Sequence, residues 1–254
     1  MNLKPFFSFY GSKYRIAPKY PPPDFDTIVE PFAGSAGYSA LYPSKNVVLY
    51  DKDPIIASLW DYLISAPEQE IIDLPNIQGD DSVDAMNIPS EAKSLIGFWI
   101  NRGSARPSKT RSAWMRAGNH DTSFWGKEIK ERIASQQKHI RHWQVRCCDY
   151  SDIDNEQATW FIDPPYNNKA GSHYKMTAKA IDYQHLAGWC RGRMGQGIVC
   201  ENNGADWLPF RHLTNAKANE SSRGGKVSKE SIWTNGTDAV RDLKGNRGPL
   251  SNRP

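Results

Sequence analysis

Short, mostly apolar runs recur along the chain and are separated by longer segments with helical patterning. Runs of four or five residues that are rich in β-branched side chains predict strands buried on both faces. The predicted strands are 27–30, 46–50, 144–148, 159–162, 197–200 and 231–234. The predicted helices are 35–41, 54–64, 123–140 and 182–193. Strands that alternate with helices in this way predict a mainly parallel α/β sheet.

The alternation is interrupted between residues 76 and 144. The stretch 75–89 at its start contains Gly79 and several acids, and it predicts a polar loop. The remainder has helical patterning. We therefore expect one α/β domain formed by residues 1–75 and 145–254, into which residues 76–144 are inserted as a helical subdomain.

Composition supports a globular chain of this class. Its 254 residues are 39% hydrophobic and 11% aromatic, too apolar for a disordered protein, and suit one large domain or one domain with an insertion. No apolar stretch approaches the ~18 residues of a membrane-spanning helix, and no apolar run near the start predicts a secretory leader. The four cysteines, and the pair His139 and His142, lack the spacing of a metal site. We expect free thiols, a cytoplasmic location and no metal.

Positive charge is concentrated in the predicted insertion. The chain as a whole carries +4, but residues 101–146 hold eleven basic and three acidic side chains, a net +8 that leaves −4 elsewhere. The tryptophans in or beside this stretch are Trp99, Trp114, Trp125 and Trp143. Basic side chains mixed with flat aromatic rings suit phosphate contacts and base stacking. A solvated helical surface with its tryptophans in the core explains the composition equally well.

The sharpest chemical signal is the segment FIDPPYNN, in which Asp163, Pro164, Pro165 and Tyr166 follow a predicted strand. Ligands bind at the carboxyl ends of strands in open α/β sheets. The prolines have no N–H group, so their carbonyls can only accept, and Asp163 adds a carboxylate acceptor. Such acceptors suit a group that only donates, such as an exocyclic amine, and Tyr166 offers a ring for a base to stack on. The alternative is an ordinary turn with a surface tyrosine.

A second signal is the segment VEPFAGSAGYS, where a predicted strand ends in an acid and a loop of small residues leads into a predicted helix. Gly34, Ser35 and Gly37 allow the backbone to approach a cofactor closely, and a helix N-terminus offers free N–H groups. The loop has neither the G-x-G-x-x-G pattern nor the Lys-Ser/Thr of a phosphate loop. Asp51 ends the next strand, where an acid can bind ribose hydroxyls. Alone, this pattern fits many tight strand-to-helix turns.

Two weaker signals complete the set. In the segment FYGSK, the aromatic residues Phe9 and Tyr10 and the cation Lys13 surround a tight turn, a combination that suits the ring-face and carboxylate contacts of an amino acid moiety. Asp149 and Tyr150 follow a third predicted strand, where the carboxylate can accept from an adenine amine. Taken singly, Lys13 could equally be a solvated lysine beside a turn, and Asp149 an ordinary loop acid.

In this order the segments FYGSK, PFAGSAG, the strand-end acid, DY and DPPY resemble the α-group, Dam-like N6-adenine DNA methyltransferases of bacteria and phages. The resemblance runs from about Phe6 to Asn235, and the insertion takes the place of that family's target-recognition region. It implies a Rossmann-like class I methyltransferase sheet that binds S-adenosylmethionine in 1–75 and 145–254 and double-stranded DNA in 76–144. It also implies a monomer, without a metal or a membrane contact, in a bacterium or a phage-infected cell.

The resemblance assigns roles to single residues. The residues that would grip the target base are Asp163, Pro164, Pro165 and Tyr166. Those that would bind the cofactor are Phe9, Tyr10, Lys13, Phe32, Ala33, Gly34, Ser35, Asp51, Asp149, Tyr150 and Asp163. Those that would contact the substrate are Tyr174, Arg102, Arg106, Arg111 and Arg116. Within the cofactor set, Phe9 and Lys13 would hold the methionine part, Asp51 the ribose and Asp149 the adenine.

The implied reaction is a direct attack by an adenine amine on the sulfonium methyl group, with the base turned out of the duplex. The Asp163 carboxylate and the Pro164 carbonyl would accept the two N–H groups of the amine. The same acceptors also serve N4-cytosine enzymes and RNA adenine enzymes, so these stay open as alternatives. A nucleic-acid-binding relative without catalysis is a third alternative, and a nucleotide-dependent oxidoreductase lacks its full glycine fingerprint here.

Overall fold

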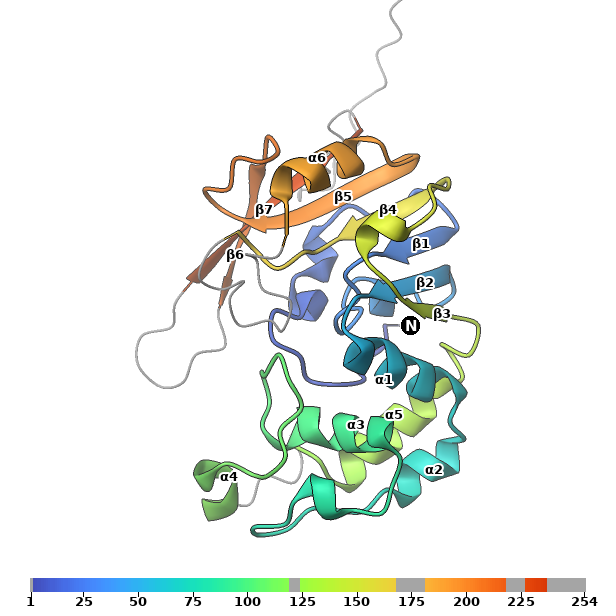
Figure 1. The fold of residues 1–254 in the computed structure, drawn as a ribbon, viewed down its shortest axis with the longest axis vertical. Helices are drawn as coiled ribbons and strands as arrows, with labels where there is room; N and C mark the ends of the chain where they lie inside the picture. The colour runs from blue at the N-terminus through green and yellow to red at the C-terminus, as the bar shows by residue number, and fades with distance from the viewer. Residues whose placement is uncertain (1, 119–123, 168–180, 218–226, 237–254) are drawn as a thin grey trace, which may run out of the picture.

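The computed structural model describes residues 2–118, 124–167, 181–217 and 227–236. They form a seven-stranded sheet in the order β3-β2-β1-β4-β5-β7-β6 (Figure 1). The strands are β1 Thr27–Glu30, β2 Asn46–Asp51, β3 Gln144–Cys147, β4 Ala158–Ile162, β5 Gly195–Asn202, β6 Arg211–Lys217 and β7 Val227–Thr234. All six predicted strands are present, which confirms the mainly parallel α/β class.

The five neighbouring strands β3, β2, β1, β4 and β5 run parallel to one another. Strand β7 is antiparallel to both β5 and β6. The parallel part has the order of a Rossmann-like sheet, in which the chain moves outward from β1 and then returns to its other side with β4. Strand β6 was not predicted, because the sequence RHLTNAK is too polar to be recognised as a buried strand.

Six α-helices belong to the described residues. They are α1 Pro54–Ser65, α2 Glu68–Asp73, α3 Ser90–Ile100, α4 Ala113–Ala117, α5 Lys127–Gln137 and α6 Tyr183–Arg191. The sequence specifies α1 and α6 well, since Asp53 caps α1 ahead of Pro54 and Asp182 caps α6. The predicted helix 123–140 is shorter, with α5 beginning after Gly126.

The helix predicted over 35–41 is wrong for most of its length. Only a 3₁₀ turn, Ser39–Leu41, forms there. Gly34 and Ala36 have φ angles of +45° and +47°, which belong to the left-handed region and cannot continue a right-handed helix. The tight turn after β1 therefore extends further along the chain than predicted.

Two hydrophobic layers cover the two faces of the sheet. On one face, Ile28 and Phe161 pack with the N-terminal segment and with α1, α3 and α5. On the other face, Val29 and Trp160 pack with α6. Adjacent residues of one strand point to opposite faces, so each central strand is buried on both sides. In Figure 1, α1, α2, α3 and α5 gather at one end of the molecule, and α6 lies along β5.

The insertion shares the first of these layers. Its buried residues continue without a break from α1 through α3 to α5, so the division at residues 76 and 144 stays a prediction. Trp99, Trp125 and Trp143 are 3%, 1% and 3% exposed, which excludes base stacking for these three rings. Trp114 on α4 is 62% exposed. The predicted polar loop 75–89 also contains buried apolar side chains and a 3₁₀ turn, Val83–Ala85.

The structure also bears on the cysteines and on membrane-spanning segments. All four cysteines are free thiols, as predicted. Among the helices of the described residues, none combines the length and the apolar character that are needed to cross a bilayer.

Candidate functional site

The ends of β1 and β4 lie side by side at the point where the strand order reverses. Ile28 is in register with Thr159, and Val29 is in register with Trp160, so Glu30 and Ile162 end the two strands at the same edge. Such a reversal opens a crevice between the loops that follow the two strands. A pocket of about 270 Å³ lies there and is lined both by the turn after β1 and by residues that follow β4.

The turn after β1, residues 31–37, brings its backbone close to its neighbours. A Cβ atom added at Gly34 would lie 3.1 Å from Cε1 of Phe9, and one added at Gly37 would lie 2.6 Å from the backbone nitrogen of Tyr14. Trp60 donates its indole N–H to the Gly34 carbonyl at 2.8 Å. Side chains larger than hydrogen would therefore fill or widen this side of the pocket. Phe32, Ala33, Gly34 and Ser35 line it, and their contact with a cofactor stays a prediction.

Asp51, at the end of β2, supports this turn. Its Oδ2 accepts from the Gly34 N–H at 3.0 Å, and its Oδ1 accepts from the Asp53 N–H at 2.9 Å. Burial raises the pKa of Asp51 to about 6, while the hydrogen bonds from these two backbone groups oppose the shift. Asp51 also lines the pocket, and binding of a ribose hydroxyl by its carboxylate stays a prediction.

Asp149 and Tyr150, which follow β3, also line the pocket. Lys52 pairs with the Asp149 carboxylate at 2.6 Å, and Ser151 donates to it through its backbone N–H. Burial favours the neutral acid, but the hydrogen bonds from Lys52 and Ser151 outweigh it and lower the pKa of Asp149. Tyr150 packs its ring against Phe32 at 5.4 Å. Asp149 is thus a carboxylate beside the pocket, as its predicted role requires.

The segment FYGSK forms a third wall. Phe9, Tyr10 and Lys13 all line the pocket. Ser12 and Ser35 bridge this wall to the turn after β1 through their hydroxyl groups, 2.8 Å apart. The three elements that the sequence singled out separately therefore surround one space, together with the end of β4.

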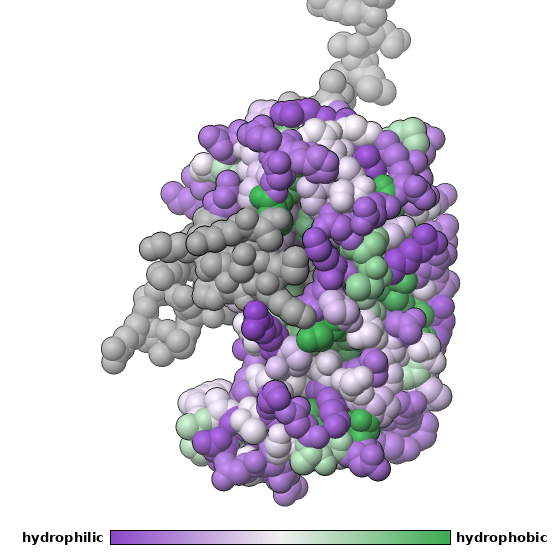
Figure 2. Space-filling model, viewed as in Figure 1, coloured by the Kyte–Doolittle hydropathy of each residue, from purple (hydrophilic) through white to green (hydrophobic). Residues whose placement is uncertain are grey.

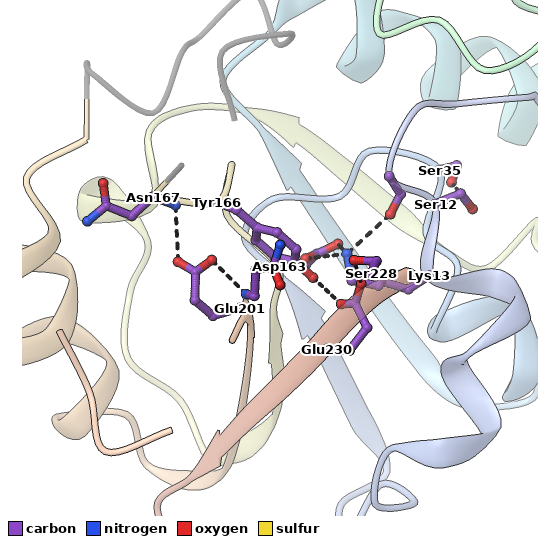
Figure 3. A network of polar contacts seen from close by, with 11 residues as sticks. Ser12, Lys13, Ser35, Asp163, Tyr166, Asn167, Glu201, Ser228 and Glu230 are labelled. Atoms are coloured by element: carbon purple, nitrogen blue, oxygen red, sulfur yellow. Dashed lines mark hydrogen bonds and ion pairs between the residues drawn. The ribbon is translucent and has the colours of Figure 1, made fainter. Parts of the chain in front are cut away.

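The buried Lys13 and the partly exposed Asp163 form an ion pair beside this space (Figure 3). The Lys13 ammonium lies 2.7 Å from each carboxylate oxygen and 4.7 Å from the centre of the Tyr166 ring. Burial raises the pKa of Asp163, and the positive charge of Lys13 opposes that shift. Lys13 is only 6% exposed, so its charge depends on this partner. Its predicted contact with a cofactor carboxylate stays a prediction.

The segment after β4 presents acceptor groups beside the pocket. Both carboxylate oxygens of Asp163 lie 2.7 Å from the Lys13 ammonium, which donates a hydrogen bond to Oδ2. The Pro165 carbonyl accepts from the Tyr183 hydroxyl at 2.5 Å. A carboxylate oxygen can accept more than one hydrogen bond, so Asp163 can still accept from a donating ligand in the pocket.

Tyr166 does not line the pocket directly, although it was predicted to offer a stacking surface there. Its hydroxyl donates to Glu230 at 2.5 Å, and its ring lies against Lys13. Pro165 and Asp163 are the members of the predicted segment that face the pocket. Tyr174 lies outside the described residues.

Four polar residues around the pocket were not predicted. Glu30 ends β1 with its side chain buried, and Oε1 accepts from both the backbone and the hydroxyl of Ser39. Burial raises the pKa of Glu30 to about 8. Glu201, Glu230 and Tyr183 hold the segment after β4. Glu30 and Glu201 are visible in the sequence as acids at strand ends, whereas Glu230 and Tyr183 carry no local signal.

The predicted DNA-contacting arginines differ in their surroundings. The Arg102 guanidinium lies between the rings of Trp99 and Phe124, at 5.8 and 5.7 Å. Arg116 pairs with Asp80 at 3.1 Å and donates to the Arg111 carbonyl. These contacts hold them within the insertion.

Arg106 is exposed and lines a shallow hollow together with Tyr10, which also lines the main pocket. Hydrophilic residues cover most of the face seen in Figure 2, and its hydrophobic areas are small. In the part of the chain that the structure describes, no group of three or more histidine, cysteine or acidic side chains is arranged to hold a metal ion.

Comparisons with known proteins leave the family open. No protein-family model matches the chain, and no curated protein matches it. Among solved structures, a conserved hypothetical protein of Streptococcus pyogenes aligns over 81% of this chain and 84% of its own, with 10% identity and a TM-score of 0.30. A likeness of that size carries no argument about function, which has to be argued from the pocket.

Proposed function

We propose that this chain transfers a methyl group from S-adenosylmethionine to the N6 amine of adenine in double-stranded DNA. One observation carries the proposal: the Asp163 carboxylate, which can accept hydrogen bonds, lines the same pocket as the glycine turn. A ligand in this pocket can touch an acceptor suited to an amine and a backbone turn suited to a cofactor at the same time.

The residues around the pocket fit the proposed cofactor. The absence of a side chain at Gly34 and Gly37 leaves room beside Phe9 and Tyr14, and Asp51 and Asp149 offer carboxylate oxygens. Phe9, Phe32 and Tyr150 supply apolar rings around them. When bound, S-adenosylmethionine would supply a methyl group on a positively charged sulfur, which is open to attack by a nucleophile.

The chain's own contribution is to orient and polarise the amine. An adenine amine is a weak nucleophile because its lone pair is delocalised into the ring. In the proposal, its two N–H groups donate to the Asp163 carboxylate and to the carbonyl of Pro164, a residue that is not among those lining the pocket, and these hydrogen bonds would localise that lone pair. Burial raises the pKa of Asp163, and the positive charge of Lys13 opposes that rise and so favours the ionised carboxylate, which is the better acceptor. Positioning and preorganised electrostatics then supply the rate.

DNA is the proposed substrate because of the insertion. Its excess of positive charge suits phosphate contacts, and exposed Arg106 lies next to Tyr10 at the pocket's edge. An amine inside a duplex cannot reach a pocket of this kind, so the base has to leave the stack at a cost of a few kcal/mol. Contacts between the insertion and the DNA backbone would offset that cost.

The structure bears differently on the alternative substrates and on the alternative classes of protein. An exocyclic amine of cytosine or of RNA adenine would fit the same acceptors, so product analysis has to separate these substrates. A dinucleotide-dependent oxidoreductase is disfavoured, because β7 is antiparallel where the dinucleotide-binding order continues with a parallel strand, and because the glycine fingerprint is incomplete. A binding protein without catalysis has no need for the buried Lys13–Asp163 pair.

The decisive experiment incubates the purified chain with S-adenosylmethionine labelled in its methyl group and with unmethylated plasmid DNA. We expect label in N6-methyldeoxyadenosine after digestion and mass spectrometry of the nucleosides. Label in N4-methyldeoxycytidine, or label only when RNA is supplied, would favour the corresponding alternative. No incorporation into any nucleic acid, with intact S-adenosylmethionine recovered, would overturn the proposal.

A further inference from the structure

Two buried glutamates approach the segment after β4 from opposite faces of the sheet. Strands β5 and β7 are antiparallel, with Glu201 opposite Ser231 and Asn202 opposite Glu230. Neighbouring residues of a strand alternate between faces, so Glu230, which shares a face with Asn202, lies on the face opposite to Glu201. Both residues are buried, with Glu230 5% exposed and Glu201 0% exposed. Buried carboxylates at these positions require donors.

Each glutamate accepts one of its hydrogen bonds from the segment after β4. Glu201 accepts from the backbone N–H of Asn167 at 3.2 Å and from the Trp207 indole at 2.9 Å. Glu230 accepts from the Tyr166 hydroxyl at 2.5 Å and from the Ser228 hydroxyl at 2.7 Å. Figure 3 shows Glu201 beside Asn167, and Glu230 on β7 beside Tyr166.

The contact with Glu230 leads directly to the ion pair. The Tyr166 hydroxyl is tied to Glu230, and the face of its ring lies 4.7 Å from the Lys13 ammonium. Lys13 in turn holds Oδ2 of Asp163. Burial raises the pKa of Tyr166, so its hydroxyl stays protonated and remains a donor to Glu230. An unbroken series of contacts therefore joins β7, which lies next to the edge strand β6, to the proposed acceptor.

We propose that Glu230 is a positioning residue for methyl transfer, which acts through the Tyr166 hydroxyl to hold the ring, Lys13 and Asp163 in place. This inference rests on the proposed function. Glu230 itself touches neither the amine nor the cofactor in this arrangement. A displacement of about 1 Å at a reacting centre can lower a rate by about 100-fold, so loss of this anchor should act on the chemical step.

The test compares two substitutions at Glu230. Glu230→Met removes the acceptor at similar volume, and we expect kcat to fall about 10- to 100-fold while the dissociation constant of S-adenosylmethionine changes less than about twofold. Glu230→Gln keeps an oxygen that can accept from Tyr166, and it should restore most of the rate. Ser228→Ala removes the other donor to Glu230 and should leave kcat unchanged.

Coupling to Tyr166 distinguishes positioning from general support of the fold. Tyr166→Phe should lower kcat as Glu230→Met does, and adding Glu230→Met to Tyr166→Phe should lower it no further. The inference would be overturned if Glu230→Met lowered kcat on the Tyr166→Phe background by the same factor as in the wild-type chain. A wild-type kcat in the single variant Glu230→Met would also overturn it. Thermal unfolding shows whether the Glu230→Met variant is folded. If it is not, the double variant Glu230→Gln/Tyr166→Phe is compared with Tyr166→Phe instead. A lower kcat in that double variant than in Tyr166→Phe would count against the inference.

Failure of the inference can be told from failure of the proposed function. A wild-type chain that neither binds S-adenosylmethionine nor methylates nucleic acid removes the proposed function. A wild-type chain that methylates DNA, together with Glu230 variants that are unchanged or uncoupled from Tyr166, removes only the role of Glu230.

Discussion

Two turns on neighbouring strands form different parts of the pocket, and they are held in different ways. The turn after β1, residues 31–37, is held through its backbone: the N–H and carbonyl groups of Gly34 form hydrogen bonds with the side chains of Asp51 and Trp60, 17 and 26 residues away. The segment after β4, residues 163–167, is held by side chains. Its contacts with Lys13 and Glu230 span 150 and 64 residues.

The difference follows from what each turn has to offer a ligand. A close backbone approach needs small residues and left-handed φ angles, which are properties of the turn itself. A set of buried acceptors needs counter-charges and donors that keep it in place, and these come from other strands. Damage to the first turn should therefore affect binding of the cofactor, and damage to the second should affect the reaction.

The largest effect is expected at Asp163. Asp163→Asn keeps the shape but removes the charge that orients the amine, so kcat should fall by at least about 100-fold. The dissociation constant of S-adenosylmethionine, measured by calorimetry, should change only a few-fold. Thermal unfolding of the variant controls for the loss of the buried charge partner of Lys13. A variant that keeps more than half of the wild-type rate would contradict the role of the segment after β4.

A smaller effect, now on binding, is expected at Gly37. A Cβ atom there would lie 2.6 Å from the backbone nitrogen of Tyr14, so Gly37→Ala has to push the N-terminal wall away from the turn after β1. Overpacking of this kind amounts to about 1–3 kcal/mol, which predicts about 5- to 100-fold weaker binding of S-adenosylmethionine. Gly188→Ala in α6, where an added Cβ meets nothing within 4 Å, is the matched control. Unchanged affinity in Gly37→Ala would argue against this wall of the pocket.

Glu30 lies between the two turns and predicts a pH dependence of stability. Its pKa is raised by burial to about 8 from a usual value of 4.5, so the folded state keeps a proton that the unfolded state releases. This contribution favours folding at low pH and is lost as pH rises from about 4.5 to about 8, by up to about 1.4 kcal/mol per pH unit.

Glu30→Gln keeps the oxygen that accepts from Ser39 and removes the titrating proton. In urea unfolding at several pH values, the variant should lose less free energy of unfolding than wild type between pH 5 and pH 8. Identical slopes for the two proteins would show that Glu30 does not titrate in this range.

The smallest effect is expected at Trp114, outside both turns. Its side chain is 62% exposed and meets the Phe124 ring edge-on at 5.9 Å. Trp114→Ala should weaken DNA binding by about fivefold, the lower end of the effect of one stacked base, and change the free energy of unfolding by less than about 0.5 kcal/mol. Cofactor affinity should not change. Unaltered binding of DNA in a fluorescence anisotropy titration would remove Trp114 from the proposed interface.

Local sequence patterns predicted much of the fold and part of the pocket. The strands 27–30 and 46–50 were recognisable because buried parallel strands are continuous apolar runs. Strand β6 and the turn over 35–41 were not, since the first is polar and the second has left-handed φ angles that the composition does not reveal. The tryptophans of the insertion allowed two interpretations until burial distinguished Trp114 from the rest.

The sequence by itself determined which chemistry the chain offers: acceptors at one strand end, a small-residue turn at another, and a lysine after an aromatic pair. Only the tertiary structure decided that they share a pocket, that Lys13 pairs with Asp163 and that Glu230 anchors Tyr166. The physical reason is distance along the chain. Periodicity and turn chemistry act over a few residues, whereas the partners of a buried charge are selected by the order of strands in the sheet.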